Sequence, residues 1–521
     1  MKRVKRFLAA VLSMSMLLMM GMTVYAGSTT SITISGGTNG SEYSAYKLLD
    51  VDDKSDTDNV KIAYTVNDDY AEILKDVINE LEDGNLDYKG QEIVTYISSL
   101  NVEEIRTFAD AVYEQVKGLD ADYVYTAEEN QFVSVEPGYY LIVETSIGDS
   151  SDTFSLVMLD TAGNDSITIT TKEDVPTLVK KVQETDDTAV TVTDWQDGAD
   201  YDIGDTIPFK LTGTLPSTYA EFTTYFYSFQ DTLSAGLDFN NDVVVKVDGT
   251  TIATGYEVVT AKVNNETTLE IRFADLKKIY DEAGNAVATT KDSVITVEYS
   301  AMLNENAVIG SAGNPNIAKL VYSNNPYYDP TGTEPETTSE TTTDKVIIFT
   351  YELDVNKVDK TGAALKGAGF TLYKLVDDKD DTTTDDYVAV GSEVSGADIT
   401  TFVFKGLDAG WYKLVETTVP AGYNQAEDIE FIVTSAYDTE ADAPAFQTLA
   451  ITDKTGNALS GAADSIFTVT DGVMTTTVEN LSGTILPSTG GIGTVIFYVV
   501  GAVIMVGAAA LYIRGRRTKE K

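Results

Sequence analysis

The stretch AGWYKLVET, residues 409–417, sets the structural character of this chain. A turn glycine is followed by two aromatic residues and then by an apolar run that carries one glutamate. Neighbouring side chains of a strand point to opposite faces, so Tyr412, Leu414 and Glu416 share one face. The stretch PGYYLIVET, residues 137–145, repeats the same frame. Both copies predict β-strands, and the repeat indicates a chain assembled from β-rich domains.

The centre of the chain continues this pattern. Alternating apolar runs occur at residues 208–211, 243–247, 268–273, 293–299 and 317–322. Asp248-Gly249 is typical of a tight hairpin turn. Short strands separated by such turns predict a β-sandwich over residues 174–333, and a second, smaller sandwich over residues 345–483.

The first region, residues 27–173, mixes strands with helices. Residues 69–81 carry apolar side chains at helical spacing, and Asn101 with Glu104 forms a capping box that opens a second helix. Strands are predicted at residues 31–34, 43–49, 138–144, 153–159 and 166–171. The predicted fold class is therefore mainly β: tandem immunoglobulin-like sandwiches behind an α+β N-terminal domain.

The stretch TGTEPETTSETTTD, residues 331–344, has almost no apolar residue. Such a composition cannot bury a core and predicts a linker, which we place at residues 334–344. Residues 484–521 form a separate C-terminal segment.

The two ends of the chain predict export and retention at the cell surface. Residues 1–26 have a basic start, an apolar core and a small-residue cleavage site, which together form a secretory signal peptide. Residues 494–513 lack charge and are long enough to cross a bilayer, and a basic tail follows.

A five-residue motif precedes that apolar run: Leu486, Pro487, Ser488, Thr489 and Gly490. It matches the sorting signal that sortases cut between threonine and glycine. The alternative is an ordinary single-pass anchor with a chance match, but the apolar run and the basic tail that follow favour the sorting signal.

Composition excludes several functions. The net charge is −46, which repels nucleic acid. The chain has no histidine, the commonest general base and metal ligand, and we expect no metal or cofactor. It also has no cysteine, so any covalent staple in this exported protein must be of another kind than a disulfide.

Three residues of the last sandwich suggest such a staple. Lys357 lies on the same face of the first strand as Leu353 and Val355. Glu416 lies on the repeat strand, and Asn480 lies near the end of the final strand. Burial disfavours the charged forms of both lysine and glutamate. A neutral amine beside an amide carbonyl could then attack it and release ammonia. Alternation alone also allows three unrelated, solvent-facing polar residues.

A family resemblance favours the cross-link. The stretches VNKVDKTG (355–362), LKGAGFTLY (365–373), LVET (414–417), PAGY (420–423) and VEN (478–480) resemble the collagen-adhesin B-type (Cna-B-like) domain of Gram-positive surface proteins. The resemblance implies an isopeptide bond between Lys357 and Asn480, with Glu416 as its catalyst.

The central sandwich resembles the corresponding domain of sortase-assembled backbone pilins, on the stretches PTLVKKV (176–182), FQDTLSAGL (229–237) and LVYSNNP (320–326). The resemblance implies a bond between Lys180 and Asn324 with Asp231 as catalyst. Lys181 and Asn325 are the alternatives, and Asp231 could instead cap a turn.

The first domain carries Glu144 but has no suitable asparagine on its last strand, since Asn164 precedes that strand. We assign no bond there. In the pilin family, a sortase joins the threonine of one subunit's sorting signal to a lysine at the end of this domain in the next subunit. Position favours Lys172 here, although its surroundings differ from the family motif, and Lys181 is the alternative.

The sequence thus predicts a structural backbone subunit of a covalent surface pilus. Its expected partners are pilin-polymerising and housekeeping sortases, identical subunits, accessory pilins and peptidoglycan. It would not be an enzyme on external substrates, because each lysine–acid–asparagine triad would react only once, within its own chain. The alternative is a wall-anchored adhesin or an accessory pilin that binds a host or partner-cell ligand.

Overall fold

A computed structural model describes most of the chain before residue 484. It covers residues 29–35, 40–53, 62–82, 84, 86–126, 131–146, 154–162, 164, 166–170, 175–186, 191–326, 335, 337–375, 387–462 and 465–483. The chain divides into two compact units. The first contains residues up to Asp186, Thr191–Thr350 and Ala436–Thr448, and the second contains Tyr351–Ser435 and most of the remainder.

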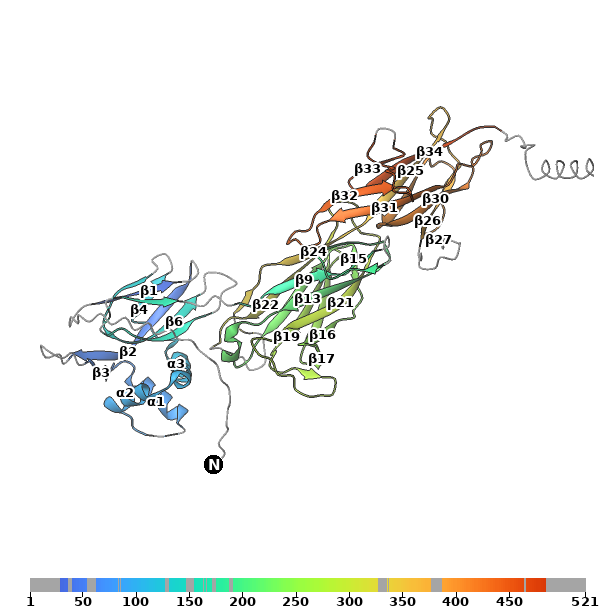
Figure 1. The fold of residues 1–521 in the computed structure, drawn as a ribbon. Helices are drawn as coiled ribbons and strands as arrows, with labels where there is room; N and C mark the ends of the chain where they lie inside the picture. The colour runs from blue at the N-terminus through green and yellow to red at the C-terminus, as the bar shows by residue number, and fades with distance from the viewer. Residues whose placement is uncertain are drawn as a thin grey trace, which may run out of the picture. The chain divides into compact units, whose positions relative to one another are not determined.

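The first region of the chain is a sheet covered on both faces. Its central strands are β2 and β6, which pair antiparallel, and β3, β4 and β7 extend the sheet. Tyr140 and Ile142 of β6 pack in the core shared with β5, β1 and β8, whereas Leu141 and Val143 pack in the core shared with helices α1, α2 and α3. The three helices lie together on one side of this region (Figure 1). The bounds are Thr30–Ser35 (β1), Glu42–Asp53 (β2), Ile62–Val66 (β3), Tyr123–Thr126 (β4), Gln131–Val135 (β5), Gly138–Ser146 (β6), Leu156–Asp160 (β7) and Ser166–Thr170 (β8).

The helices are Ala71–Leu81 (α1), Gln91–Ser99 (α2) and Val102–Val116 (α3). The predicted capping box at the start of α3 is confirmed, because Asn101 and Glu104 exchange backbone-to-side-chain hydrogen bonds of 2.9 and 3.0 Å. Helix α2 was not predicted. Its isoleucine, valine, threonine and tyrosine residues favour strands, but Ile93, Val94 and Ile97 are buried in the helical layer.

The middle region is a β-sandwich, as predicted, and each of its two sheets has seven strands. One sheet has the order β12-β24-β22-β14-β19-β18, with β23 also paired to β22. Its bounds are Gly198–Asp200 (β12), Tyr227–Leu233 (β14), Glu257–Val263 (β18), Glu266–Phe273 (β19), Asn314–Ser323 (β22), Thr338–Glu340 (β23) and Asp344–Phe349 (β24).

The other sheet has the order β20-β17-β16-β21-β13-β9, with β15 also paired to β21. Its bounds are Leu178–Val182 (β9), Thr206–Gly213 (β13), Leu237–Phe239 (β15), Val244–Val247 (β16), Thr250–Thr254 (β17), Tyr280–Asp281 (β20) and Ile295–Leu303 (β21). Asp248 and Gly249 both have positive φ and form the predicted turn between β16 and β17. A short ribbon, Thr185–Asp186 (β10) with Thr191–Val192 (β11), and a 3-10 helix, Ser217–Glu221, complete the region.

The boundary after this sandwich differs from the prediction. Part of the expected linker forms β23, and β24 lies beyond the expected end of the domain, yet both strands pair with β22. Backbone hydrogen bonds do not require apolar side chains, so β23 forms from threonine, serine and glutamate. Val346 and Ile348 of β24 are fully buried in the same core. The sandwich therefore extends to Phe349, and β25 begins only two residues later.

The last region is a smaller sandwich of two sheets. The first has the order β29-β25-β34-β33, in which β25 and β34 run parallel, and the second has the order β27-β26-β30-β31-β32 with β28 also on β26. The bounds of the first sheet are Tyr351–Asp359 (β25), Thr401–Leu407 (β29), Phe467–Thr470 (β33) and Val473–Asn480 (β34). Those of the second are Gly369–Leu375 (β26), Tyr387–Ala389 (β27), Val394–Ser395 (β28), Gly410–Thr418 (β30), Ile429–Tyr437 (β31) and Phe446–Thr452 (β32).

Among the described residues, no helix is long and apolar enough to cross a membrane. The predicted signal peptide, the sorting motif and the apolar run at residues 494–513 lie outside the described residues.

Candidate functional site

Three buried polar residues meet inside the last sandwich. Lys357 lies on β25, Asn480 ends β34, and Glu416 lies on β30 of the opposite sheet; all are at most 2 % exposed. Lys357 pairs in register with Val478 on the parallel neighbouring strand. Side chains two residues apart share a face, which brings Asn480 to the amine of Lys357.

The contacts in this group join all three side chains. The Nζ of Lys357 donates to Oδ1 of Asn480 and to the carbonyl of Val478 at 3.2 Å. The Nδ2 of Asn480 donates to both carboxylate oxygens of Glu416, at 2.8 and 3.1 Å. Oε1 of Glu416 also lies 3.4 Å from Nζ of Lys357. One carboxyl group therefore contacts both nitrogens.

Burial changes the protonation of this lysine. Loss of hydration lowers the pKa of Lys357 below its ordinary value, and the charge of Glu416 opposes the shift. A depressed pKa makes the neutral, nucleophilic form of the amine more accessible. The backbone N–H of Ala426 donates to Oε2 of Glu416 at 2.8 Å, which fixes the carboxyl group in place.

A second group of this kind lies inside the middle sandwich. Lys180 of β9 and Asp231 of β14 are buried, and Nζ of Lys180 lies 2.6 Å from Oδ2 of Asp231. Tyr299 of β21 donates its hydroxyl hydrogen to the same oxygen at 2.5 Å and accepts from Nζ of Lys180 at 3.0 Å. Asn316 of β22 donates from Nδ2 to the hydroxyl of Tyr299 at 2.8 Å.

The structure corrects the asparagine predicted for this group. Asn324 is buried, but its amide contacts Ser339 and Thr337, each at 3.0 Å. It follows the end of β22, several residues along the chain from Asn316. The expected alternation of β22 was right, since Asn316 shares the buried row with Ala318, Leu320 and Tyr322. The sequence did not reveal which end of that row faces Lys180.

The choice between adjacent lysines has a clear structural counterpart. Lys180 is fully buried, and loss of hydration lowers its pKa despite the nearby Asp231 carboxylate. Lys181 points the other way and pairs with Asp197 at 2.9 Å and Glu440 at 2.7 Å. Of the two adjacent lysines, Lys180 is therefore the one that lies in the core.

The first region has a different arrangement. Glu144 of β6 is buried and accepts the backbone N–H of Ser155 at 3.1 Å. Lys47 of the neighbouring β2 pairs with Asp50 at 2.7 Å and Glu136 at 2.9 Å. The amide of Asn164 donates to the carbonyl of Ala162 at 3.3 Å.

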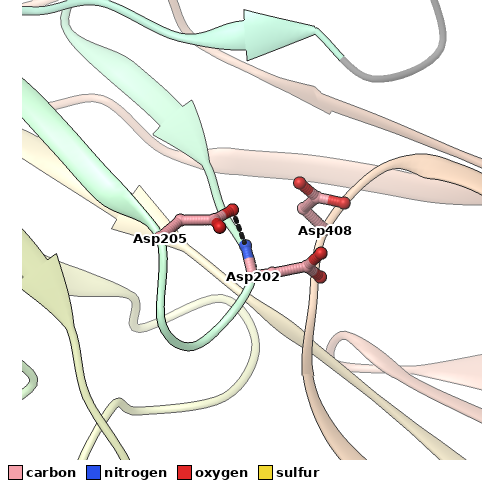
Figure 2. A group of neighbouring side chains, drawn as sticks. All are labelled: Asp202, Asp205 and Asp408. Atoms are coloured by element: carbon pink, nitrogen blue, oxygen red, sulfur yellow. Dashed lines mark hydrogen bonds between the residues drawn. The ribbon is translucent and has the colours of Figure 1, made fainter. Parts of the chain in front are cut away.

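Other buried or clustered carboxylates serve local structure. Asp202 and Asp205 flank the turn before β13, where the backbone N–H of Asp202 donates to the Asp205 carboxylate at 3.2 Å (Figure 2). Asp408, also drawn there, belongs to the second unit, where it lies 2.5 Å from Nζ of buried Lys374. Lys374 thus pairs with a buried carboxylate, as Lys180 does.

The residues expected to take part in polymerisation lie outside the described residues. These are Lys172 and the sorting motif, Leu486 to Gly490.

Comparison with known proteins supplies three family matches. Residues 203–326 match the model for the Gram-positive pilin backbone subunit 2, Cna-B-like domain. Residues 351–443 match a prealbumin-like fold domain, and residues 486–520 match the LPXTG cell wall anchor motif. The Cna-B-like description thus falls on the middle sandwich rather than on the last one.

The chain is also similar to a surface protein in sequence and to a solved structure in fold. The trypsin-resistant surface T6 protein of Streptococcus pyogenes serotype M6 is 28% identical over 412 residues, which cover 66% of this chain and 70% of the relative. The solved structure of the T6 backbone pilin of serotype M6 Streptococcus pyogenes has a similar fold, with a TM-score of 0.54 at 17% identity. The alignment covers 89% of this chain and all of that one.

These matches define the class as Gram-positive surface proteins with an LPXTG cell wall anchor. Within that class, the middle sandwich matches the domain of a Gram-positive pilin backbone subunit. The chain is an extracellular structural subunit of a pilus held at the cell wall, as the sequence predicted.

Proposed function

We propose that this pilin is covalent at two levels: a sortase joins subunits head to tail, and two sandwiches in each subunit are closed by internal isopeptide bonds. The observation that supports this best is the pair of buried lysine–carboxyl–asparagine groups. Burying three such polar side chains together is costly unless their interactions are satisfied, and a covalent bond would remove the buried charge.

In the last sandwich, the neutral amine of Lys357 attacks Cγ of Asn480. Glu416 contacts both nitrogens, so its carboxyl group takes the proton that Nζ of Lys357 loses and delivers a proton to the departing Nδ2 of Asn480. The Nζ–Cγ bond forms, the Cγ–Nδ2 bond breaks, and one ammonia leaves. The 2.8 Å contact from Nδ2 to Glu416 supports this role, because the carboxyl group already touches the leaving group.

In the middle sandwich, Lys180 and Asn316 are the proposed partners, with Asp231 as the acid. Among the described residues, Oδ1 of Asp231 and Oδ1 of Asn316 are both buried without a hydrogen-bond partner. Moving the proton of Lys180 to Asp231 leaves a neutral amine and a carboxylic acid. That acid then has a hydrogen to offer to the amide oxygen of Asn316.

The position of the bonds suits a fibre under tension. The bond of the last sandwich would join its first strand, β25, to its last, β34, and close a loop between residues 123 positions apart. By analogy with disulfides, such a loop closure stabilises the fold by about 5 kcal/mol. Pulling force would pass through the bond rather than unzip the strands.

Between subunits, the proposed bond joins Thr489 to Lys172 of the next copy. In the sequence, Lys172 falls at the boundary between the first two regions, and a lysine at a domain boundary is in general easier for a bulky acyl-enzyme to reach than a core lysine. Lys181, the alternative, is engaged by Asp197 and Glu440. The other proposed partners are a housekeeping sortase, peptidoglycan and accessory pilins.

Polymerisation is tested by immunoblotting cell-wall extracts boiled in denaturant, from cells that express the chain with its sortases. The wild type should give a high-mass ladder. Lys172→Ala should leave only monomer, and Lys181→Ala, the matched control, should keep the ladder. If the ladder survives in Lys172→Ala, another lysine accepts the threonine of the neighbouring subunit. A single band in the wild type would contradict head-to-tail joining.

The internal bonds are tested separately by peptide mapping of the exported chain. One cross-linked peptide pair should contain Lys357 and Asn480, and another should contain Lys180 and Asn316. Recovery of these four residues in ordinary linear peptides would overturn the internal cross-links without affecting the pilus assignment.

A further inference from the structure

The middle group contains a fourth side chain, Tyr299, that the lysine–acid–asparagine pattern does not include. We propose that Tyr299 is a catalytic residue of the middle cross-link, passing a proton from the amine of Lys180 to the departing amide nitrogen of Asn316. This inference rests on the proposed function of the group.

The hydroxyl of Tyr299 is the atom at which the group converges. It donates to Asp231 at 2.5 Å, accepts from Nζ of Lys180 at 3.0 Å, and accepts from Nδ2 of Asn316 at 2.8 Å. The nitrogen that loses a proton and the nitrogen that gains one thus contact the same oxygen. A group in that position can exchange protons with both.

The other sandwich explains why this tyrosine is needed. There, Glu416 contacts both nitrogens itself, at 3.4 Å from Lys357 and 2.8 Å from Asn480. Asp231 has one methylene fewer and contacts the amine of Lys180 at 2.6 Å. The Tyr299 hydroxyl supplies the remaining connection to the amide. Aspartic acid and tyrosine together therefore do what glutamic acid does alone.

The ring of Tyr299 is held by packing. It stacks on Phe209, with centroids 5.4 Å apart and planes 23° apart, and meets the edge of Phe239 at 5.8 Å. Burial raises the pKa of Tyr299 well above its ordinary value, and the neighbouring Asp231 raises it further. The phenol therefore stays protonated and keeps a hydrogen to transfer, in a site without competing bulk water.

The proton balance is closed. Neutral Lys180 attacks Cγ of Asn316, and its nitrogen must then lose a proton. Attack makes Nδ2 tetrahedral and gives it a lone pair, so it can accept the hydroxyl hydrogen of Tyr299 instead of donating to the oxygen. Tyr299 recovers a proton from Nζ. The Cγ–Nδ2 bond breaks, ammonia leaves, and no oxidant or reductant is needed.

The test measures how fast each bond forms in newly made protein. The residue 27–489 chain is synthesised in a cell-free reaction, samples are quenched in denaturant at intervals, and the two cross-linked peptides are quantified. Tyr299→Phe keeps the stacked ring and removes the hydroxyl. The Lys180–Asn316 bond should form at least about 100-fold more slowly, because 100-fold is the lower end of the rate loss expected when an acid–base group is removed. The Lys357–Asn480 bond should form at the wild-type rate.

Tyr227→Phe is the matched control, because it removes another buried hydroxyl from the same sandwich. That hydroxyl donates to the Thr214 carbonyl at 2.9 Å, so the bond should form at the wild-type rate. If Tyr299→Phe misfolds, a more acidic fluorotyrosine at position 299 serves as the second test. It keeps both the ring and the hydroxyl, and it should change the rate at which the Lys180–Asn316 bond forms.

The outcomes separate the two proposals. A wild-type rate in folded Tyr299→Phe, or with fluorotyrosine at position 299, overturns the role of Tyr299 alone. Absence of the Lys180–Asn316 cross-link from the wild type overturns the proposed function of the group itself.

Discussion

The middle and last sandwiches bury the same kind of lysine but surround it differently. In the last sandwich one glutamate reaches both nitrogens, and amine and amide lie on adjacent parallel strands. In the middle sandwich, the lysine and asparagine come from opposite sheets, and an aspartate and a tyrosine connect them. Under the proposed mechanism, an acidic hydrogen-bonded bridge connects the amine to the amide. A sandwich can build that bridge from one side chain or from two.

The largest expected effect comes from removing the acid. Glu416→Gln and Asp231→Asn should each prevent the bond in their own sandwich while leaving the lysine and asparagine in place. Each unbonded sandwich should lose about 5 kcal/mol of stability, measured by guanidinium unfolding. Glu393→Gln is the control, since its carboxylate accepts from Thr417 and Thr418 beside the site. An unchanged unfolding midpoint in Glu416→Gln would contradict the claim that this carboxyl group is needed for a stabilising bond in the last sandwich.

The choice of asparagine gives the next test. Asn316→Ala should abolish the middle cross-link, whereas Asn324→Ala should retain it, because Asn324 contacts Ser339 and Thr337. Both asparagines are fully buried, so the two variants are matched in exposure. Intact mass reads the result directly. The reverse outcome would restore Asn324 as the partner.

A buried carboxyl group outside both sites sharpens the comparison through pH. Burial, together with the nearby Asp200, raises the pKa of Glu184 from 4.5 to about 9, and Tyr437 and Gln196 hydrogen-bond to it. A bonded Lys180 no longer titrates, whereas Glu184 does. In the unfolded chain Glu184 loses its proton near pH 4.5, whereas in the folded protein it keeps that proton up to about pH 9. The contribution of Glu184 to folding stability is therefore complete below about pH 4.5 and is lost as the pH rises towards 9.

The free energy of unfolding of the middle sandwich should therefore fall by up to about 1.4 kcal/mol per pH unit over that range. Glu184→Gln should flatten this dependence in denaturant titrations at several pH values. Glu298→Gln, which breaks a half-buried pair with Lys246, should not. A dependence that persists in Glu184→Gln would assign the titration to another group.

The smallest effect concerns the first region, for which we propose no cross-link. Asn101→Ala removes the capping box of α3 and should cost about 1 kcal/mol. Hydrogen exchange of the α3 amides should report this loss, while protection in the two sandwiches stays unchanged. Equal loss in all three regions would mean that the regions unfold together.

Much of this architecture could be predicted from local patterns. Alternation along single strands placed Lys180, Lys357 and Glu416 on buried faces, and turn chemistry placed the Asp248-Gly249 hairpin. These features depend on neighbours in sequence. The helix α2 was missed because its strand-favouring residues are helical only through burial against α1 and α3.

The remaining errors have one physical source. Asn316 and Asn324 both lie among buried residues of one segment, and only the packing of β9 against β22 decides which one meets Lys180. Tyr299 looks like an ordinary core tyrosine in sequence, because nothing local indicates that β21 brings its hydroxyl to Asp231. Strands β23 and β24 were assigned to a linker and to the next domain because their pairing partner, β22, is set by the whole sandwich.

The most direct test of two self-closed sandwiches is the intact mass of the exported wild-type chain under denaturing conditions. We predict a mass below that of its sequence by two molecules of ammonia, one for each buried lysine–asparagine pair. A mass equal to that of the sequence would contradict both bonds.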